Sequence, residues 1–259
     1  MTTYQRFLAG ELRVAVLTSW DDGHATDFPV QGWLHELGLS GTLFATTHAL
    51  GAVDGECRQD AVPVVSEAQL LWLGQQPGIE IGAHTHGHIC IERIESAERV
   101  DNLRLCKRKL ESIVGKPVVS FAYPEGGGMD EQKLSECARD LACLGFKSGR
   151  LMRHVAPLAI GELWERRFTM PTTGELGDMP VPQIRAVLQD AAARDEQTVV
   201  HFCAHSSRIL KKRDHVPPGA MEAALRALTE NAGDYSRDIA WFCTQGELTA
   251  ALEERFGPR

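Results

Sequence analysis

Short apolar runs alternate with amphipathic, helix-like segments along almost the whole 259-residue chain. This alternation constrains the fold most, because strands separated by helices form parallel βαβ units rather than hairpins. Strands are expected at Val14–Trp20, Gly41–Thr47, Ile79–Ala83, Val118–Tyr123, Phe146–Leu151, Arg166–Met170, Thr198–Ala204 and Ile239–Thr244. Helices are expected at Ser96–Val114 and near residues 30–37, 66–75, 130–142, 182–194, 218–231 and 246–255.

Seven or eight such units predict an α/β fold, a distorted (β/α) barrel with seven or eight mainly parallel strands. No linker, low-complexity segment or internal repeat divides the chain, so we expect a single domain over residues 1–259. The least regular stretch is 152–180. In a (β/α) barrel the active site lies at the C-terminal ends of the strands, and each polar cluster described below follows such an end.

Charge and composition exclude several kinds of partner. The chain has 27 basic and 35 acidic residues, and this net charge of -8 argues against binding to nucleic acid or to an anionic membrane surface. The sequence has neither an apolar run of the roughly 18 residues that span a bilayer nor the pattern of a secretory signal. We therefore expect a cytoplasmic protein without membrane insertion, and a homo-oligomer is compatible with the sequence. Its seven cysteines form no CxxC pair, so reduced and mostly buried thiols are expected.

Two adjacent aspartates, Asp21 and Asp22, follow the first expected strand. Neighbouring side chains project in different directions from an extended chain, so one carboxylate can bind a cation while the other faces a reacting centre. Asp-Asp-Gly is also good turn chemistry. The pair therefore indicates a site only in combination with other residues.

Three histidines, His84, His86 and His88, follow the strand Ile79–Ala83. Packing does not explain them well, because imidazoles in a dry core would leave polar atoms without partners. A metal site explains them better. All three share one face of a strand, whereas His84 and His88 would meet on a helical turn, so spacing alone permits more than one ligand pair. Two imidazoles and one carboxylate make the three-ligand set of an open catalytic zinc site.

Two later strands also end in polar residues. Pro124-Glu125-Gly126-Gly127-Gly128 follows the fourth strand and is either an ordinary loop or a source of accessible backbone N–H groups that stabilise an oxyanion. His205 follows Thr198–Ala204, and a pKa near 6.5 suits an imidazole to protonate a leaving amine. His201, four residues earlier on the same strand face, is interpreted as a hydrogen-bonded core or supporting residue.

These clusters, in this order, resemble the motifs of the polysaccharide deacetylase family, the NodB-homology carbohydrate esterases, over about Val14 to Thr249. Ser-Trp-Asp-Asp-Gly is similar to the family's Thr-Phe-Asp-Asp-Gly, which implies Asp21 as the general base and Asp22 as a metal ligand. His84-Thr85-His86-Gly87-His88 resembles the family's His-Ser/Thr-x-x-His. That likeness implies His84 and His88 as ligands and leaves His86 as the variable interior position.

The resemblance extends to the two later clusters. Phe121-Ala122-Tyr123-Pro124-Glu125-Gly126 resembles the family's groove motif, which implies that the backbone N–H of Glu125 contributes to the oxyanion hole. His205 is similar to the late histidine that serves the family as general acid.

Two departures from the family pattern concern the catalytic aspartate. The groove motif often carries an arginine that pairs with it, and this chain has Ala122 there, while Glu125 replaces a usual aromatic residue. Another group must then orient Asp21, and Arg166 and Arg167 in the expected strand Arg166–Met170 are the candidates. Further candidates for orienting or supporting contacts are His201 and Tyr123.

The resemblance implies a metal-dependent hydrolase that removes the N-acetyl group from an amino sugar or glycan precursor. Biosynthesis of a bacterial surface polysaccharide of the O-antigen type would suit that activity. The expected cofactor is a divalent metal ion, zinc first, with cobalt, manganese or nickel as alternatives. The expected partner is an N-acetylated sugar or oligosaccharide, and the sequence leaves open whether it is free, nucleotide-linked or lipid-linked.

Two other functions are compatible with the sequence. One is a metal hydrolase of the same fold that acts on a non-sugar amide. The other is a sugar-binding protein whose catalysis is weakened by the altered groove motif. Intact Asp21, Asp22, His84 and His88 argue against the second.

Overall fold

The computed structural model describes residues 1–51, 53–54, 62–126, 130–210 and 219–257. At its centre lies a curled sheet whose neighbouring strands pair in parallel. The order across the sheet is β10 (Gly174–Glu175), β11 (Thr198–Ala204), β1 (Val14–Trp20), β2 (Gly41–Ala45), β5 (Ile79–Ala83), β6 (Ser120–Ala122), β7 (Ser148–His154) and β9 (Met170–Thr172).

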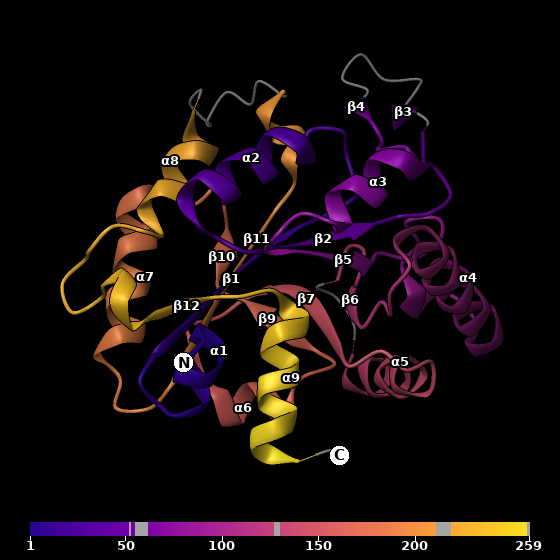
Figure 1. Cartoon of the computed structure of the whole chain (residues 1–259). Helices are drawn as coiled ribbons and strands as arrows, with labels where there is room; N and C mark the ends of the chain where they lie inside the picture. Colours follow the sequence, from indigo (N-terminus) through magenta and orange to yellow (C-terminus); the bar gives the residue numbers. More distant parts are fainter. Residues whose placement is uncertain (52, 55–61, 127–129, 211–218, 258–259) are drawn as a thin grey trace.

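The two ends of this sheet, β9 and β10, are separated in the chain only by Thr173. Its N–H donates to the carbonyl of His201 on β11 at 2.6 Å. One short extended segment therefore crosses from the β7 side to the β11 side, and the sheet curls back on itself. Figure 1 shows helices on the outside of these strands. The predicted distorted (β/α) barrel with mainly parallel strands is confirmed.

Within the described residues, four short strands lie off this path. β12 (Ala240–Phe242) pairs with the first half of β1, and β8 (Leu158–Ala159) pairs antiparallel with β11. β3 (Val53–Asp54) and β4 (Val62–Pro63) form a separate antiparallel pair. Because β2 pairs with β1 only at Ser19 and Trp20, β12 provides partners for the other half of the same edge.

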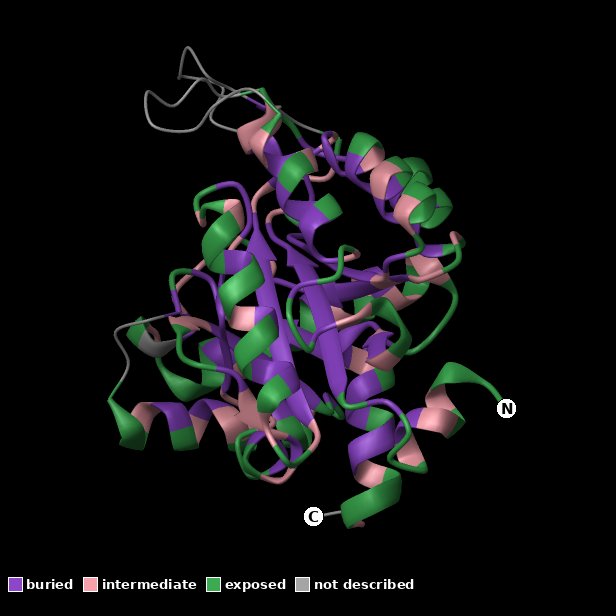
Figure 2. Ribbon diagram, turned by 90° about the vertical axis from the view of Figure 1, so that its left-hand side faces the viewer, coloured by how far each residue is buried: buried purple, intermediate pink, exposed green. Residues whose placement is uncertain are grey.

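The helices turn apolar faces to the sheet and polar faces outward, as Figure 2 shows by burial. In the longest described helix, Leu103, Cys106 and Leu110 recur at helical spacing and are fully buried. The described helices are α1 (Thr3–Leu8), α2 (Asp27–Leu37), α3 (Glu67–Gly74), α4 (Ser96–Val114), α5 (Glu131–Cys143), α6 (Ile160–Glu165), α7 (Val181–Ala193), α8 (Ala220–Ala227) and α9 (Gln245–Phe256). Three 3₁₀ turns are η1 (Ile91–Arg93), η2 (Ser206–Ile209) and η3 (Arg237–Ile239).

The expected strand Arg166–Met170 is wrong. Ile160, Leu163 and Trp164 recur at helical spacing and are buried, so the preceding residues form α6 and Arg166 is its C-cap. The strand of this region, β9, begins only at Met170. Charged residues next to apolar ones in Arg166–Met170 give a pattern like that of a strand. Only the packing of the folded chain shows that no strand forms there before Met170.

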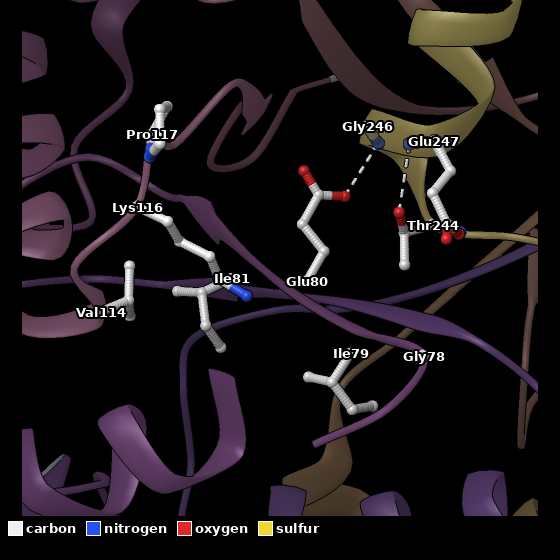
Figure 3. Close-up of a pocket in the computed structure, with 10 residues that line it drawn as sticks. All are labelled: Gly78, Ile79, Glu80, Ile81, Val114, Lys116, Pro117, Thr244, Gly246 and Glu247. Atoms are coloured by element: carbon white, nitrogen blue, oxygen red, sulfur yellow. Dashed lines mark hydrogen bonds between the residues drawn. The ribbon is translucent and has the colours of Figure 1, made fainter. Parts of the chain in front are cut away.

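The N-terminal ends of the strands are closed by a polar cluster around Glu80. Its carboxylate accepts hydrogen bonds from the Thr42 hydroxyl at 3.0 Å, the Ser120 hydroxyl at 2.6 Å and the Gly246 N–H at 2.8 Å. Figure 3 shows this carboxylate at the start of α9. Gln245 is fully buried beside it and donates to Ser148 on β7 at 2.9 Å. The cluster fixes α9 under the barrel, because a carboxylate stabilises exposed N–H groups at a helix N-terminus.

Within the described ranges, no helix combines the length and apolarity needed to cross a membrane. Six cysteines are described and all are free thiols, whereas Cys57 lies outside the described residues. Four of the six are buried: Cys106, Cys137, Cys203 and Cys243. The single domain over residues 1–259 stays a prediction.

Candidate active site

The two aspartates leave β1 in different directions. Asp21 continues the strand ladder, since its N–H donates to the carbonyl of Ala204 at 3.0 Å. Asp22 has a left-handed backbone with φ of 79°, and Gly23 follows with φ of 73°. This change of conformation separates the carboxylates: Asp21 pairs with Arg150, whereas Asp22 lies among histidines. The Asp-Asp-Gly segment is therefore a turn and a divergent carboxylate pair at the same time.

The histidine segment is neither a continued strand nor a helical turn. β5 ends at Ala83, and the left-handed backbone of Thr85 (φ 66°) and His88 (φ 51°) folds the segment back. The rings of His84 and His88 then lie 5.1 Å apart between centroids. His86 is turned aside, with Nδ1 at 2.8 Å from the Thr47 hydroxyl.

A hydrogen bond fixes the tautomer of His84. Its Nδ1 lies 2.9 Å from the backbone carbonyl of Ala122, and a carbonyl can only accept, so Nδ1 carries the proton. Nε2 is then the bare nitrogen that can bind a metal. The side chain is 2% exposed, so this orientation is held by the surrounding protein.

Asp22, His84 and His88 bring one donor atom each within 4.8 Å of the others. Asp22 Oδ1 lies 3.2 Å from His88 Nε2 and 3.6 Å from His84 Nε2, and no described group donates a well-formed hydrogen bond to this buried oxygen. Burial acts to raise the pKa of Asp22, but the interactions with His84 and His88 outweigh it and hold the pKa well below its usual range. An unsatisfied carboxylate oxygen between two imidazoles fits a divalent cation.

Backbone strain is concentrated at this site. Among the described residues, the non-glycine positions with positive φ are Asp22, Thr85, His88 and Glu125. Each left-handed residue of this kind costs free energy and persists only where its surroundings impose it. All four lie in the segments that follow β1, β5 and β6, which is the distribution expected of a functional site.

The guanidinium beside Asp21 belongs to Arg150 on β7. Arg150 is fully buried, and its Nη2 pairs with Asp21 Oδ1. The guanidinium carbon lies 5.3 Å from the ring centre of Phe44, which packs against its face. An arginine retains its charge in proteins, so the pair keeps the Asp21 carboxylate in one orientation.

The prediction that Arg166 or Arg167 orients Asp21 is therefore not met by the geometry. Arg166 pairs with Glu162 on α6 at 3.2 Å, and its side chain is 54% exposed. The guanidinium of Arg167 lies over the ring of Trp164, 4.6 Å from its centre. Both residues follow a helix on the outside of the barrel, because the strand expected there is absent.

His205 is held beside Asp22 by a carboxylate that sequence reasoning missed. Its Nδ1 lies 3.0 Å from Glu175 Oε1 on β10, and its Nε2 lies 3.9 Å from Asp22 Oδ2. Arg208 pairs with the same Glu175 oxygen. Burial acts to lower the pKa of His205, but the Glu175 hydrogen bond and the charges of Asp21 and Asp22 outweigh it and raise the pKa. A charged His205 can therefore present an Nε2 proton towards the metal-ligand cluster.

Glu125 lies in the turn after β6 with φ of 50°. Within the described part of the chain, no carbonyl accepts its N–H. Its carboxylate is near Arg93 at 3.5 Å and accepts from the Cys90 thiol at 2.9 Å, so the side chain lies at the rim. Gly127 and Gly128 of the same loop lie outside the described residues.

His201 and Tyr123 occupy supporting positions. His201 is 3% exposed, its Nε2 lies 3.0 Å from the Ser19 hydroxyl, and burial, with Arg150 nearby, lowers its pKa to about 3. It is therefore a neutral core residue, as the sequence suggested. The Tyr123 hydroxyl donates to the carbonyl of Phe168 at 3.0 Å, which supports a packing role.

Sequence reasoning missed Arg150, Glu175 and Arg208. The available signal for Arg150 was a lone arginine inside an expected strand, Phe146–Leu151. Glu175 carried no comparable signal, since it lies in the irregular stretch 152–180 and acquires its role through tertiary contact with His205.

Solved structures provide a comparison for the fold. The chain resembles a probable polysaccharide deacetylase from Pseudomonas aeruginosa PAO1 with a TM-score of 0.60 and 13% identity, over 97% of this chain and 94% of that one. It resembles a family 4 acetyl xylan esterase from Clostridium thermocellum, in complex with a cobalt ion, with a TM-score of 0.54 and 13% identity, over 91% and 90% of the two chains. At these identities the likeness shows the fold alone.

A deacetylase from Streptococcus pyogenes, PplD in complex with acetate, is 16% identical over 59% of this chain. The chain covers only 61% of that protein, and the TM-score of 0.47 is too low to inform the fold. None of the curated proteins matches the chain. Residues 11–142 match the sequence model of the family described as polysaccharide deacetylase, which covers half of the chain. The chain therefore belongs to the polysaccharide deacetylase family, whose carbohydrate esterases are hydrolases.

Proposed function

We propose that the protein is a metal-dependent hydrolase that removes the N-acetyl group from an amino sugar or a glycan precursor. The observation that carries this proposal is the convergence of Asp22, His84 and His88 beside Asp21 and His205. The three segments that bear these residues follow β1, β5 and β11, where a (β/α) barrel presents its active site.

The chain's own residues divide the work of acetamide hydrolysis. Asp21, oriented by Arg150, accepts the proton of the attacking water. The Glu125 N–H donates to the oxyanion that forms on the acetyl carbonyl, and loss of one such donor typically costs roughly 10² to 10³ in rate. His205 donates its Nε2 proton to the departing amine, so that acetate and a free amino sugar leave.

A divalent cation held by Asp22, His84 and His88 supplies the polarisation of the carbonyl and the acidification of water that this reaction requires. Zinc is the first choice, with cobalt, manganese or nickel as alternatives for the same donor set. The acetyl xylan esterase of similar fold is in complex with a cobalt ion, which supports a divalent metal for this protein.

The proposed substrate is an N-acetylated sugar or oligosaccharide. Membership of the polysaccharide deacetylase family supports an acetylated glycan. An amine leaving group must take up a proton, which a charged His205 beside Glu175 can deliver. As its setting we propose the biosynthesis of a bacterial surface polysaccharide of the O-antigen type. A cytoplasmic enzyme would meet such a substrate as a nucleotide-linked or lipid-linked precursor.

The experiment is an acetate-release assay on free, nucleotide-linked and lipid-linked N-acetyl sugars, with protein that has been stripped of metal and reloaded with zinc or cobalt. We expect reloading to restore acetate release in the wild type but not in Asp21→Asn. Arg166→Ala is the matched control and should leave the rate unchanged, because Arg166 is the exposed C-cap of α6 and pairs with Glu162.

The same assay separates the alternatives. Release of formate or ammonia from non-sugar amides, without acetate from any sugar, would identify a different amide hydrolase of this fold. Binding of glycans by metal-loaded protein without any turnover would contradict the enzymatic proposal.

A further inference from the structure

Two side chains at the N-terminus of α2, those of Thr26 and Asp27, reach the turn that follows His205. The hydroxyl oxygens of Thr26 and Ser206 lie 2.8 Å apart, and Ser206 directly follows His205 in the chain. A side-chain hydrogen bond with Ser206 is also among the influences that act on the pKa of the Asp27 carboxyl, which places the two groups close together. Exposure is 7% for Thr26, 1% for Asp27 and 0% for Ser206, so water does not compete for these contacts.

This arrangement replaces ordinary helix capping. Thr26 is the N-cap of α2, yet its side chain makes no capping hydrogen bond. A threonine at an N-cap normally accepts from the first turn, which is worth about 1 kcal/mol. Asp27 Oδ1 is buried and has no hydrogen-bond partner among the described residues. The two residues most suited to capping α2 are turned towards Ser206 instead, which indicates that the link has a purpose other than helix stability.

The surroundings of Asp27 disfavour a negative charge on its carboxyl, in addition to the charges of Asp21 and Asp22. Burial raises the pKa of its carboxyl to about 8; the Ser206 hydrogen bond and the charge of His205 oppose this rise, and the charges of Asp22 and Asp21 add to it. A neutral carboxyl can donate and accept hydrogen bonds. An amide of the same shape can do both as well, so asparagine is the matched replacement.

We propose that Asp27 is a positioning residue for His205, which it holds in place through Ser206. This inference rests on the proposed function, in which His205 protonates the departing amine. Glu175 fixes the imidazole ring of His205 at Nδ1. Ser206, the next residue in the chain, connects the backbone after His205 to the start of α2. A general acid displaced by about 1 Å can lose about 10² in rate, so both attachments matter.

The test compares Asp27→Ala, Asp27→Asn and Ser206→Ala in zinc-loaded protein on an N-acetyl sugar. We expect Asp27→Ala and Ser206→Ala to lower kcat by about tenfold to a hundredfold, with KM and bound zinc unchanged, because the metal ligands are not touched. Asp27→Asn should recover most of the lost kcat. Circular dichroism checks that each variant is folded. If Asp27→Ala does not fold, Ser206→Ala still tests the inference.

A second arm changes the leaving group. A 4-nitrophenolate departs without a proton, so the loss caused by Asp27→Ala should be smaller on 4-nitrophenyl acetate than on the N-acetyl sugar. Equal losses on both substrates, an unchanged kcat in Asp27→Ala and Ser206→Ala, or an Asp27→Asn variant as slow as Asp27→Ala would each overturn the inference. If the wild type itself releases no acetate from N-acetyl sugars, the proposed function fails first, and this inference fails with it.

Discussion

The two ends of the barrel enclose carboxylates in opposite ways. At the N-terminal end, Glu80 accepts from two hydroxyls and one backbone N–H, so its charge is dispersed over three donors, of which Figure 3 draws the Gly246 N–H. At the C-terminal end, Asp22 Oδ1 lies between His84 and His88 without a well-formed hydrogen bond from any described group. The backbone at this end is also strained, at Asp22 and at three further residues.

This difference shows how to interpret polar residues in one sheet. A carboxylate whose oxygens are satisfied by protein donors stabilises the structure, and Glu80 fixes α9 in this way. A carboxylate that is left short of donors, on a strained backbone, has been kept for a ligand. The five predictions below test this distinction and are ordered by the size of the expected effect.

Asp22→Asn should abolish metal binding and lower the rate of acetate release by about 10³ or more, because the metal contributes several kcal/mol of charge stabilisation. Zinc stoichiometry and initial rates measure the two effects. Glu80→Gln is the control at the other end of the barrel and should retain its zinc. Equal zinc content in wild type and Asp22→Asn would contradict the assignment of Asp22.

Arg150→Met should lower kcat by about 10², since Asp21 loses the group that orients it. Arg150→Lys should recover part of the rate, because the charge remains but the planar fork does not. Arg166→Ala provides the exposed-arginine control, measured in the same assay. A rate that falls in Arg166→Ala and not in Arg150→Met would reverse our account of the orienting arginine.

Glu80→Ala should reduce the free energy of unfolding by about 1–3 kcal/mol and leave the rate per folded molecule unchanged, because Thr42, Ser120 and Gly246 lose their acceptor. Urea unfolding measures the loss. A variant as stable as the wild type would show that these hydrogen bonds do not fix α9.

The same site carries a pH dependence of stability. Burial raises the pKa of Glu80 above its usual 4.5, so between that value and the raised one the folded protein retains a proton that the unfolded chain has lost. Stability associated with Glu80 is then complete below pH 4.5 and declines as the pH rises through the raised pKa. Glu80→Gln has no such proton and should remove this decline from the unfolding curves.

Glu175→Gln should produce the smallest change, a shift of the alkaline limb of the pH–rate profile to lower pH. Glu175 acts to raise the pKa of His205, so its loss lets the imidazole give up its proton earlier. Glu222→Gln is the control, because Glu222 lies on α8 and pairs with Arg226. If the alkaline limb stays in place in Glu175→Gln, the group whose deprotonation causes that limb is not His205.

The sequence could place the residues that directly follow an expected strand. Asp21, Asp22, His84 and His88 follow two strands directly, and a parallel sheet brings such ends together, so their convergence could be predicted from periodicity and resemblance. The barrel itself followed from the alternation of strands and helices.

Residues that act across the barrel could not be placed in this way. Arg150 and Asp21 are separated by 129 positions in the sequence, and Glu175 and His205 by 30. A local sequence pattern does not show that such residues are in contact. The wrong strand at Arg166–Met170 had the same origin. Burial of Leu163 and Trp164 makes the preceding residues the helix α6, so Arg166 ends a helix instead of starting a strand, and burial is a property of the folded chain.

Anomalous diffraction at the zinc absorption edge, from crystals of the zinc-loaded protein, tests the Asp22, His84 and His88 metal site most directly. We expect one strong peak at about 2.0–2.2 Å from Asp22 Oδ1, His84 Nε2 and His88 Nε2, and no peak beside Glu80. A zinc ion bound by other residues, or no ordered zinc at Asp22, would contradict this assignment.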